Sequence, residues 1–366
     1  MLNYEFPPLG GGASPVSYEI AKGYVRLGHR VTVVTMGYRG LPKHEVKDGI
    51  EIYRVPCLRS KKEICHPWEQ LTYNISAKRF LRKHLKHNHY DINHTHFIIP
   101  TGIVSLWVKK KFGIPYIITS HGSDVPGYNK DRFKFLHKFT KPILNVVCRD
   151  ALIVTVPSNS LRNLILKNIN PDLKKKTIVL PNGSSDFYMK GIKKENIIVS
   201  SGRMHVGKGF QYIIRAFNEL NPESWKLFLL GDGPYKKELV KNAKGNPNII
   251  FTGWINNNTK RYRSILNKAK IFVLLSEFES QGIVYLEAMS AGCAILASNI
   301  SACKETVSPN VGYLVNRKNI AEIKKKLKEL MYDDVRLNQM MSKARKRYED
   351  NYKWDKIIKK YEALLR

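Results

Sequence analysis

The stretch KIFVLLSEFESQGIVYLEAMSAGCAILASN, residues 270–299, has the pattern of one strand–helix–strand unit and decides the fold class. Its two ends, 270–276 and 294–299, are short continuous apolar runs, as expected for strands that are buried on both faces. The segment between them has a helical pattern that begins at Gly282. Parallel strands need a crossover helix of this kind, so the stretch predicts an α/β fold with a parallel sheet.

The same alternation continues along almost the whole chain, in two sets. The other expected strands are VTVVTM (31–36), IPYIITS (114–120), ALIVTVPS (151–158) and TIVLPN (177–182) in the first set, and NIIVSSG (196–202), WKLFLLGDG (225–233) and NIIFTGW (248–254) in the second. A polar segment with two glycines, 183–195, separates the sets. We therefore expect two Rossmann-like, doubly wound parallel-sheet domains, residues 1–185 and 186–349.

The chain is strongly basic, with 62 Lys and Arg against 30 Asp and Glu and a formal net charge of +32. The excess is spread along the sequence and is nearly equal in the two halves. Such a charge favours anionic partners: nucleotides, phospholipid surfaces or nucleic acid. A lysine-rich proteome would explain the same balance with no partner at all.

Other features of the composition indicate a soluble protein of the cytoplasm. There are five cysteines, an odd number, and no pair has the C-x-x-C spacing, which favours a reducing compartment and incidental thiols. No run of 18 apolar residues predicts a membrane-spanning helix. The first residues lack the layout of a signal peptide.

Distinctive residues follow the expected strands, at the end where open parallel sheets bind ligands. Gly10, Gly11 and Gly12 in PPLGGG let backbone N–H groups approach a phosphate at the start of a helix, although a plain tight turn explains them equally well. We expect Ser14 to cap that helix and Pro15 to be its first residue. His121 in SHGSD ends a strand and can donate to a hydroxyl or an oxyanion, or it has a structural hydrogen bond.

The loop SSGRMHVGKGF, residues 200–210, combines Gly202 with two cations, Arg203 and Lys208. An arginine fork and a lysine point charge together suit a diphosphate and would neutralise the charge that grows on a departing nucleotide. Ordinary surface cations are the alternative, because this chain has many.

The block EFESQGIVYLEAMSAG, residues 277–292, contains Glu279 and Glu287 on either side of a helix start. The helix start offers free backbone N–H groups, expected from Gly282 and the two residues after it, Ile283 and Val284. Such a layout can hold sugar hydroxyls and phosphate together. A carboxylate near a helix start is also ordinary capping.

Taken together, these blocks resemble family 4 of the glycosyltransferases, which have the GT-B fold. The resemblance covers essentially the whole chain and rests on PPLGGG, SHGSD, GRMHVGKGF, LLGDGP (229–234), FTGW (251–254) and ESQGIVYLEAMSAG, in this order and each after a strand. It implies two domains that face each other across a cleft. It also implies that a final helix, residues 350–366, packs back on the first domain.

The resemblance implies a retaining enzyme that moves a hexose-type sugar from a UDP- or GDP-sugar to an acceptor hydroxyl, without a cofactor. The implied catalytic residues are Glu279 beside the sugar, His121 near it, and Arg203 and Lys208 on the diphosphate; the implied donor-binding residues are Gly11, Gly12, Gly202, Gly282, Ile283, Val284 and, on the ribose, Glu287. Where the family often has an aromatic residue, this chain has Gln281, and this difference affects which donor sugar the site would recognise. The chain also begins almost inside its first strand, where relatives have several more apolar residues.

No metal is expected, because the chain has no Asp-x-Asp triplet. The histidines in HLKHNHYDINHTH (84–96) have a spacing that metal ligands can have. However, they span a helix end and a strand, and DINHTHF resembles an ordinary strand of this family. The segments 72–90 and 130–147 mix Lys and Arg with apolar residues. They fit helices on an anionic membrane, or surface helices with one core face. On the membrane interpretation, Lys78, Arg79, Arg82 and Lys83 face a lipid-linked or surface glycan acceptor and the protein is peripheral.

Three other interpretations remain open at this stage. A nucleic-acid-binding protein would explain the charge but not the ordered glycine, Arg/Lys and Glu blocks, and it would cluster its basic residues on one face. A nucleotide-sugar epimerase on the same fold would act without an acceptor. A degenerate homologue that only binds is the third, and the presence of all four charged site residues argues against it.

Overall fold

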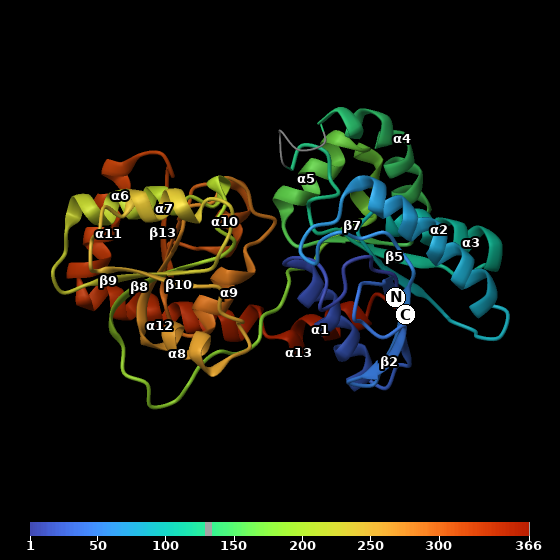
Figure 1. The fold of residues 1–366 in the computed structure, drawn as a ribbon, viewed down its shortest axis with the longest axis horizontal. Coiled ribbons are helices and arrows are strands. Elements are labelled where there is room, and N and C mark those ends of the chain that lie inside the picture. Colours follow the sequence, from blue (N-terminus) through green and yellow to red (C-terminus); the bar gives the residue numbers. More distant parts are fainter. Residues whose placement is uncertain (129–133, 366) are drawn as a thin grey trace. The chain divides into compact units, whose positions relative to one another are not determined.

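The computed structural model describes residues 1–128 and 134–365, and the chain forms two compact units (Figure 1). Unit 1 consists of Met1–Asn182 and Trp354–Arg366, and unit 2 of Gly183–Lys353. The sequence placed the boundaries at 185/186 and 349/350. Residues 350 and 351 complete a helix of unit 2, so the last helix of the chain begins later than expected.

Unit 2 is built on a six-stranded sheet in which every pairing is parallel. Its strands are β8 (Glu195–Ser201), β9 (Lys226–Leu230), β10 (Ile249–Gly253), β11 (Ala269–Leu274), β12 (Ala294–Ser298) and β13 (Gly312–Val315), in the order β10-β9-β8-β11-β12-β13. In the middle of the sheet, Ile198 pairs with Leu227 on one side and Ile271 on the other. All three are fully buried, which explains why these strands are continuous apolar runs.

Helices cover both faces of this sheet, as the doubly wound prediction requires (Figure 1). The helices α6 (Phe210–Leu220), α7 (Lys236–Asn242) and α11 (Ile320–Tyr332) lie on one face, and α8 (Lys260–Lys268), α9 (Ile283–Ser290) and α12 (Asp334–Asn351) on the other; α10 (Ser301–Thr306) precedes β13. The 310 turn η2 (Val206–Lys208) precedes α6.

The described residues of unit 1 form seven strands in two groups. These are β1 (Val31–Met36), β2 (His44–Lys47) and β3 (Ile50–Val55), and then β4 (Asn93–His96), β5 (Tyr116–Thr119), β6 (Val154–Val156) and β7 (Thr177–Val179), ordered β1-β3-β2 and β4-β5-β6-β7. Among these described strands, β2 runs antiparallel to its neighbour β3, and the other pairings within the two groups are parallel. The helices are α1 (Ala13–Arg26), α2 (Pro67–His84), α3 (Thr101–Phe112), α4 (Lys134–Asp150), α5 (Asn159–Asn168), η1 (Pro171–Lys175) and α13 (Trp354–Glu362), which packs beside α1.

The first residues of the chain join the two groups of strands. Leu2 forms parallel bridges to Val34 of β1 and to Thr95 of β4. Its amide donates to the His94 carbonyl at 3.0 Å, and its carbonyl accepts from the His96 amide at 2.9 Å. This short segment therefore completes one mixed, mainly parallel sheet, and the α/β prediction is confirmed for both units.

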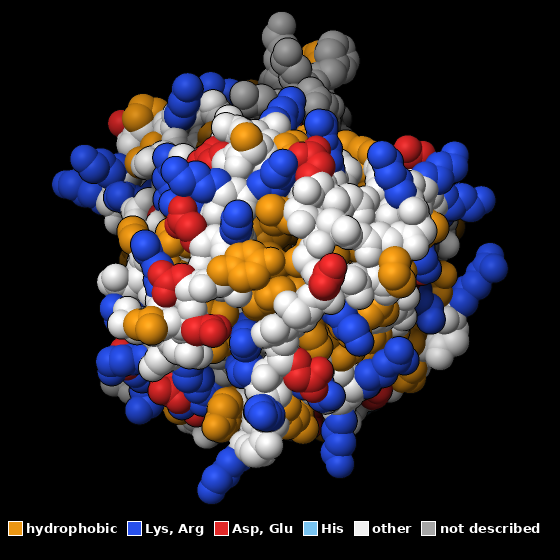
Figure 2. Space-filling model, turned by 90° about the vertical axis from the view of Figure 1, so that its left-hand side faces the viewer, with side chains coloured by type: hydrophobic (Ala, Val, Ile, Leu, Met, Phe, Trp, Pro, Cys, Tyr) orange, Lys and Arg blue, Asp and Glu red, His pale blue; other side chains and the backbone are white. Residues whose placement is uncertain are grey.

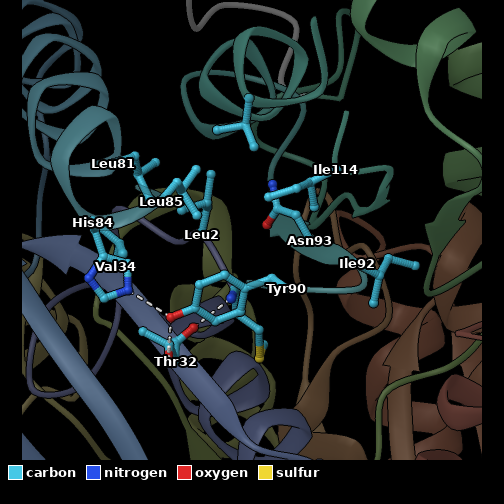
Figure 3. A pocket seen from close by; sticks show the side chains of 12 residues that line it. Leu2, Thr32, Val34, Leu81, His84, Leu85, Tyr90, Ile92, Asn93 and Ile114 are labelled. Atoms are coloured by element: carbon cyan, nitrogen blue, oxygen red, sulfur yellow. Dashed lines mark hydrogen bonds between the residues drawn. The ribbon is translucent and has the colours of Figure 1, made fainter. Parts of the chain in front are cut away.

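A pocket opens at the amino-terminal edge of this sheet (Figure 3). It is lined mainly by apolar side chains, among them Leu2, Leu81 and Ile114, and the Tyr90 hydroxyl bonds His84 Nε2 at 2.7 Å and Thr32 Oγ1 at 3.1 Å. Thr32 and Asn93 begin their strands, so the pocket lies at the opposite edge from the strand ends where ligands bind in such folds.

Two local predictions for unit 1 were wrong or missing. The first helix begins at Ala13 with Gly12 as its cap, because the Ser14 amide already donates to the Gly11 carbonyl at 3.1 Å and the Ser14 side chain is buried. The β2–β3 hairpin was not expected from the sequence. Its turn is formed by Asp48 and Gly49, which both have positive φ. The dipeptide Asp-Gly is a recognised signal for a two-residue hairpin turn.

Unit 2 supplies a test of one close backbone approach. Gly209 has a φ of +74°, and a Cβ there would lie 2.0 Å from the Leu275 carbonyl oxygen. Gly245, in the same unit, has a φ of +70° but open space around it. Both alanine substitutions place a side chain on a left-handed backbone, which costs roughly 1–2 kcal/mol. Gly209→Ala also brings the new Cβ against the Leu275 carbonyl, so the backbone must move.

We expect Gly209→Ala to lower the free energy of unfolding by about 2 kcal/mol more than Gly245→Ala does. A difference of this size is typical of a substitution that forces the backbone to move. Urea denaturation followed by circular dichroism measures both. Equal losses in the two variants would contradict the contact with Leu275.

Candidate active site

The strand order of unit 2 reverses between β8 and β11, which are neighbours in the sheet but far apart in sequence. Crossovers on the two sides of this point run in opposite directions, and ligands of such sheets bind at the carboxyl ends of the strands there. The loop after β8 is residues 202–209, and the loop after β11 is residues 275–282. The two most distinctive blocks of the sequence therefore lie at the one place where this topology predicts a ligand.

Backbone contacts hold these two loops together. The Glu277 amide donates to the Gly207 carbonyl at 2.8 Å, and Gly209 lies directly against Leu275. A third loop, LLGDGP, supports them: a Cβ on Gly231 would lie 2.0 Å from the Gly202 carbonyl oxygen. The glycine-rich blocks of unit 2 thus allow three loops to pack backbone to backbone.

The structure brings Lys208 and Glu279 together. Lys208 Nζ donates to Glu279 Oε1 at 2.6 Å, and the Ser276 hydroxyl donates to the same oxygen at 2.9 Å. The Glu279 side chain is 10% exposed and that of Lys208 31%, so the pair lies at the surface edge of the site. A charge-assisted bond this short gives both side chains a defined position.

Arg203 lies in the same loop but is exposed, and within the described part of the chain no hydrogen bond or ion pair to its side chain is found. It therefore remains available to an anion. The helix α9 begins at Ile283, with Gly282 at φ +84° as its N-cap. The backbone N–H groups of Gly282, Ile283 and Val284 have no acceptor within the helix. This helix start therefore favours negative charge.

Glu287 lies inside α9 and is almost fully buried. Its Oε1 accepts from Asn257 Nδ2 at 3.1 Å and its Oε2 from the Tyr262 hydroxyl at 2.9 Å, while Tyr262 also contacts Ser201 Oγ at 3.0 Å. Burial raises the pKa of Glu287, and the two hydrogen bonds only partly offset that effect.

Sequence reasoning did not find Asn257 or Tyr262. Asn257 follows β10 and Tyr262 is on α8, so both come from the connection at the same edge of the sheet as the other site loops. That position after a strand is the signal that would have indicated them.

In unit 1, His121 follows β5 by two residues and lies partly exposed at the carboxyl edge of the sheet. Its Nε2 is 3.0 Å from His96 Nδ1. Burial lowers the pKa of His121 to about 3, so the ring is neutral near pH 7. The buried Asp124 shapes this loop, because its carboxylate accepts from the Ser120 hydroxyl and from the amides of Gly122 and Ile98.

Gly11 and Gly12 also lie at the carboxyl edge of unit 1, just before α1. Both are exposed, no other atom lies within 4 Å of where a Cβ on either would be, and no side chain caps the helix. The preceding Gly10 is anchored, because its amide donates to the Lys62 carbonyl at 2.8 Å. The loop therefore offers accessible backbone next to a helix start, as an anion requires.

The histidines of segment 84–96 do not form one site. His94 and His96 are buried in β4, while His87 and His89 are exposed beyond α2. Among residues 1–128 and 134–365, no three His, Cys, Asp or Glu side chains are grouped as a metal would need.

The positive charge is spread over the face of the molecule that Figure 2 draws. Figure 2 shows Lys and Arg side chains scattered over one face of the molecule with acidic side chains between them. Lys78, Arg79, Arg82 and Lys83 lie on α2, and residues 130–133 of the second basic segment lie outside the described residues. None of the helices that the structure describes is both long enough and apolar enough to cross a membrane.

Comparison with known proteins gives two family matches that divide the chain. The family described as Glycosyltransferase Family 4 matches residues 10–185, and the family described as Glycosyl transferases group 1 matches residues 186–347. An uncharacterised glycosyltransferase of Methanocaldococcus jannaschii is 28% identical, over 98% of this chain and 95% of that protein. The N-acetyl-alpha-D-glucosaminyl L-malate synthase of Bacillus anthracis is 25% identical, over 98% and 94%.

Among solved structures, the Anabaena protein HepE in complex with UDP-glucose has a TM-score of 0.78, with 16% identity and coverage of 100% of this chain and 98% of that one. At this level of identity the likeness shows the fold. The fold is the GT-B architecture of two Rossmann-like domains.

The buried carboxyl of Glu287 predicts a pH-dependent stability. Because its pKa is raised above the ordinary value of 4.5, the folded chain binds this proton more tightly than the unfolded chain. The resulting stability is complete below pH 4.5 and is lost as pH rises through the raised pKa. Glu287→Gln stays neutral, so it should gain stability relative to the unmodified protein between pH 4.5 and 7, by about 1.4 kcal/mol per unit of pKa shift.

Urea denaturation at both pH values measures this gain. Glu238→Gln, at an exposed carboxylate of α7, is the control and should show no such trend. A stability difference between Glu287→Gln and the unmodified protein that stays constant with pH would show that Glu287 is not desolvated.

Proposed function

Because the chain belongs to the glycosyltransferases, joining a Family 4 domain to a group 1 domain, we propose that it moves a hexose-type sugar from a nucleoside diphosphate to an acceptor hydroxyl with retention of configuration. That it is a glycosyltransferase acting on nucleotide sugars follows from the family. The observation that supports the proposed site is the convergence of Lys208, Glu279 and Glu287 at the point where the strand order of unit 2 reverses.

The donor would bind to unit 2 through its diphosphate and ribose. Arg203 is free for a phosphate, and Lys208 would turn from Glu279 toward the diphosphate when the donor arrives. The amides at the start of α9 add partial positive charge. Glu287 would accept hydrogen bonds from the ribose hydroxyls, replacing those from Asn257 and Tyr262.

The chemistry requires stabilisation of the leaving diphosphate and of a sugar that becomes electron-poor. Arg203 and Lys208 would neutralise the leaving group, together with backbone amides at Gly11 and Gly12. Glu279 would orient the sugar and stabilise its developing positive charge. Among the described residues, Lys208 and Ser276 donate hydrogen bonds to Glu279. Retaining hydrolases instead place two carboxylates close together. His121 would bind the transferred sugar.

A UDP-sugar or a GDP-sugar is the proposed donor, and the similar fold of a protein solved with UDP-glucose supports the first. Gln281, buried between Glu279 and Gly282, is the position at which donor choice would differ from that of relatives. Its main-chain carbonyl accepts from Thr306 Oγ1 at 3.1 Å, which holds this part of the loop in place.

The acceptor is proposed to be a lipid-linked or surface glycan reached at an anionic membrane. On α2, Trp68, Leu71 and Ile75 are each more than half exposed and recur on one side of the helix. Lys78, Arg79 and Arg82 continue that side, with Lys83 beside them, and the neighbouring α3 ends in three lysines. Exposed apolar residues followed by basic ones suit a helix at a lipid headgroup surface.

Binding of the donor provides the first test. Thermal shift with UDP, GDP and their sugars should identify one stabilising ligand. Arg203→Ala and Lys208→Ala should each weaken it about 10- to 100-fold, the loss expected for one charge-assisted hydrogen bond. Lys226→Ala, at the start of β9 on the opposite edge of the sheet, is the control.

Product analysis then separates the competing enzymes. A transferase releases free nucleoside diphosphate and joins the sugar to an acceptor with an α or β linkage that nuclear magnetic resonance assigns, whereas an epimerase returns a changed nucleotide sugar. If no nucleotide or nucleotide sugar shifts the melting temperature, the proposed donor site is wrong.

Membrane binding has its own test. Replacing Lys78, Arg79, Arg82 and Lys83 by alanine should weaken binding to vesicles rich in phosphatidylglycerol by roughly 4 kcal/mol, at about 1 kcal/mol per basic residue near the surface. Vesicle flotation measures it. The control variant removes the same charge from unit 2, at Lys226, Lys237, Lys241 and Lys244, and should bind normally. If both variants bind equally, α2 is not the membrane-facing element.

A further inference from the structure

Three histidines lie side by side in the core of unit 1, and two of them have no place in the proposed reaction. The rings of His94 and His96 stack with centroids 4.6 Å apart, and those of His96 and His121 are 5.3 Å apart with planes only 10° from parallel. His94 and His96 are buried, whereas His121 is partly exposed. A row of imidazoles therefore leads from the core of unit 1 to the partly exposed His121.

The hydrogen bonds of His94 are complete. Its Nδ1 lies 3.0 Å from the Tyr24 hydroxyl, and its Nε2 lies 2.7 Å from Thr119 Oγ1. Thr119 in turn contacts Thr155 Oγ1 at 2.7 Å. His94 is thus held by α1 and β5, and it provides a fixed surface against which the His96 ring stacks.

His96 differs, because only one of its nitrogens is bonded. Its Nδ1 is 3.0 Å from His121 Nε2, while its Nε2 is buried and without a partner among the described residues. Burial lowers the pKa of His96 well below 6.5 and that of His121 to about 3, so both rings are neutral near pH 7. Each neutral ring has one N–H and one lone pair, and the shared bond needs one of each.

Two arrangements satisfy that bond. If His121 donated from Nε2, then His96 would accept at Nδ1 and have a buried N–H with no acceptor at Nε2. If His96 donates from Nδ1, the unused group at Nε2 is a lone pair. Unpaired buried N–H groups are rarer in proteins than under-used acceptors, so the second arrangement is favoured.

We infer that His96 is a positioning residue that donates from Nδ1 to His121 and thereby holds His121 with its proton on Nδ1. His121 then presents an N–H donor to its ligand. A donor of this kind stabilises a hydroxyl or carbonyl oxygen that gains negative charge, and it cannot act as a base. The inference about the tautomer depends only on unit 1; its importance for transfer rests on the proposed function.

Nitrogen-15 resonance of the histidine rings in the ligand-free protein tests the tautomer directly. Protonated and unprotonated ring nitrogens have well-separated shifts, and two-bond proton–nitrogen correlations assign them. We expect His121 to be protonated at Nδ1 and His96 to be protonated at Nδ1. Protonation of His121 at Nε2 would overturn the inference, whether or not the chain transfers a sugar.

Two variants test the consequence. His96→Leu removes the donor and should lower kcat about 100-fold, the usual loss when one preorganised donor is disordered, with little change in KM for the nucleotide sugar. His96→Asn places an amide N–H near the position of Nδ1 and should recover most of that rate. The thermal shift by nucleoside diphosphate should stay unchanged in both, because unit 2 binds it.

These outcomes separate the two proposals. If the unmodified protein binds no nucleotide, the proposed function fails and the resonance experiment still decides the tautomer. If it transfers sugar and His96→Leu, shown to be folded by circular dichroism, has the same kcat, then His96 does not position His121.

Discussion

The reversal of strand order between β8 and β11 is the constraint on which the site of unit 2 depends. Right-handed crossovers require the helices on the two sides of that point to cover opposite faces of the sheet, so the two loops that follow β8 and β11 are the ones that meet. They place Lys208 and Glu279 within 2.6 Å although 71 residues separate them in sequence. The start of α9 lies at the end of the second loop, which adds an electropositive helix terminus to the same place.

Each unit has buried polar side chains among its candidate site residues or directly beside them. Glu287 is buried at an energetic cost, and its neutral partners Asn257 and Tyr262 satisfy the carboxylate without neutralising its charge. In unit 1, the neutral rings of His94 and His96 are buried, and the adjacent His121 reaches the surface edge. Buried networks of this kind limit the orientations of their members, which is what a site that must hold a reactive sugar requires.

Much of the fold followed from pattern alone. Short apolar runs predicted nine of the strands that the described residues form, because strands buried on both faces appear in the sequence as continuous apolar segments. These strands are β1, β5, β6, β7, β8, β9, β10, β11 and β12. The strands β2, β3 and β13 were not predicted from the sequence. β2 and β3 form a hairpin with mixed polar and apolar residues, and β13 is only four residues long. The Ser14 cap was predicted wrongly, because the helix already begins at Ala13 and the Ser14 amide donates to the Gly11 carbonyl.

The sequence by itself determined which groups emerge at the carboxyl ends of strands, and hence the loops with Arg203, Glu279 and His121, because a strand followed by a helix orients its connecting loop whatever the rest of the chain does. Only the tertiary structure decided which of those groups meet. The Lys208–Glu279 pair, the Asn257 and Tyr262 contacts to Glu287, and the bond from His96 to His121 all join residues on separate elements. Their distances depend on sheet order and packing, which no local pattern of residues encodes.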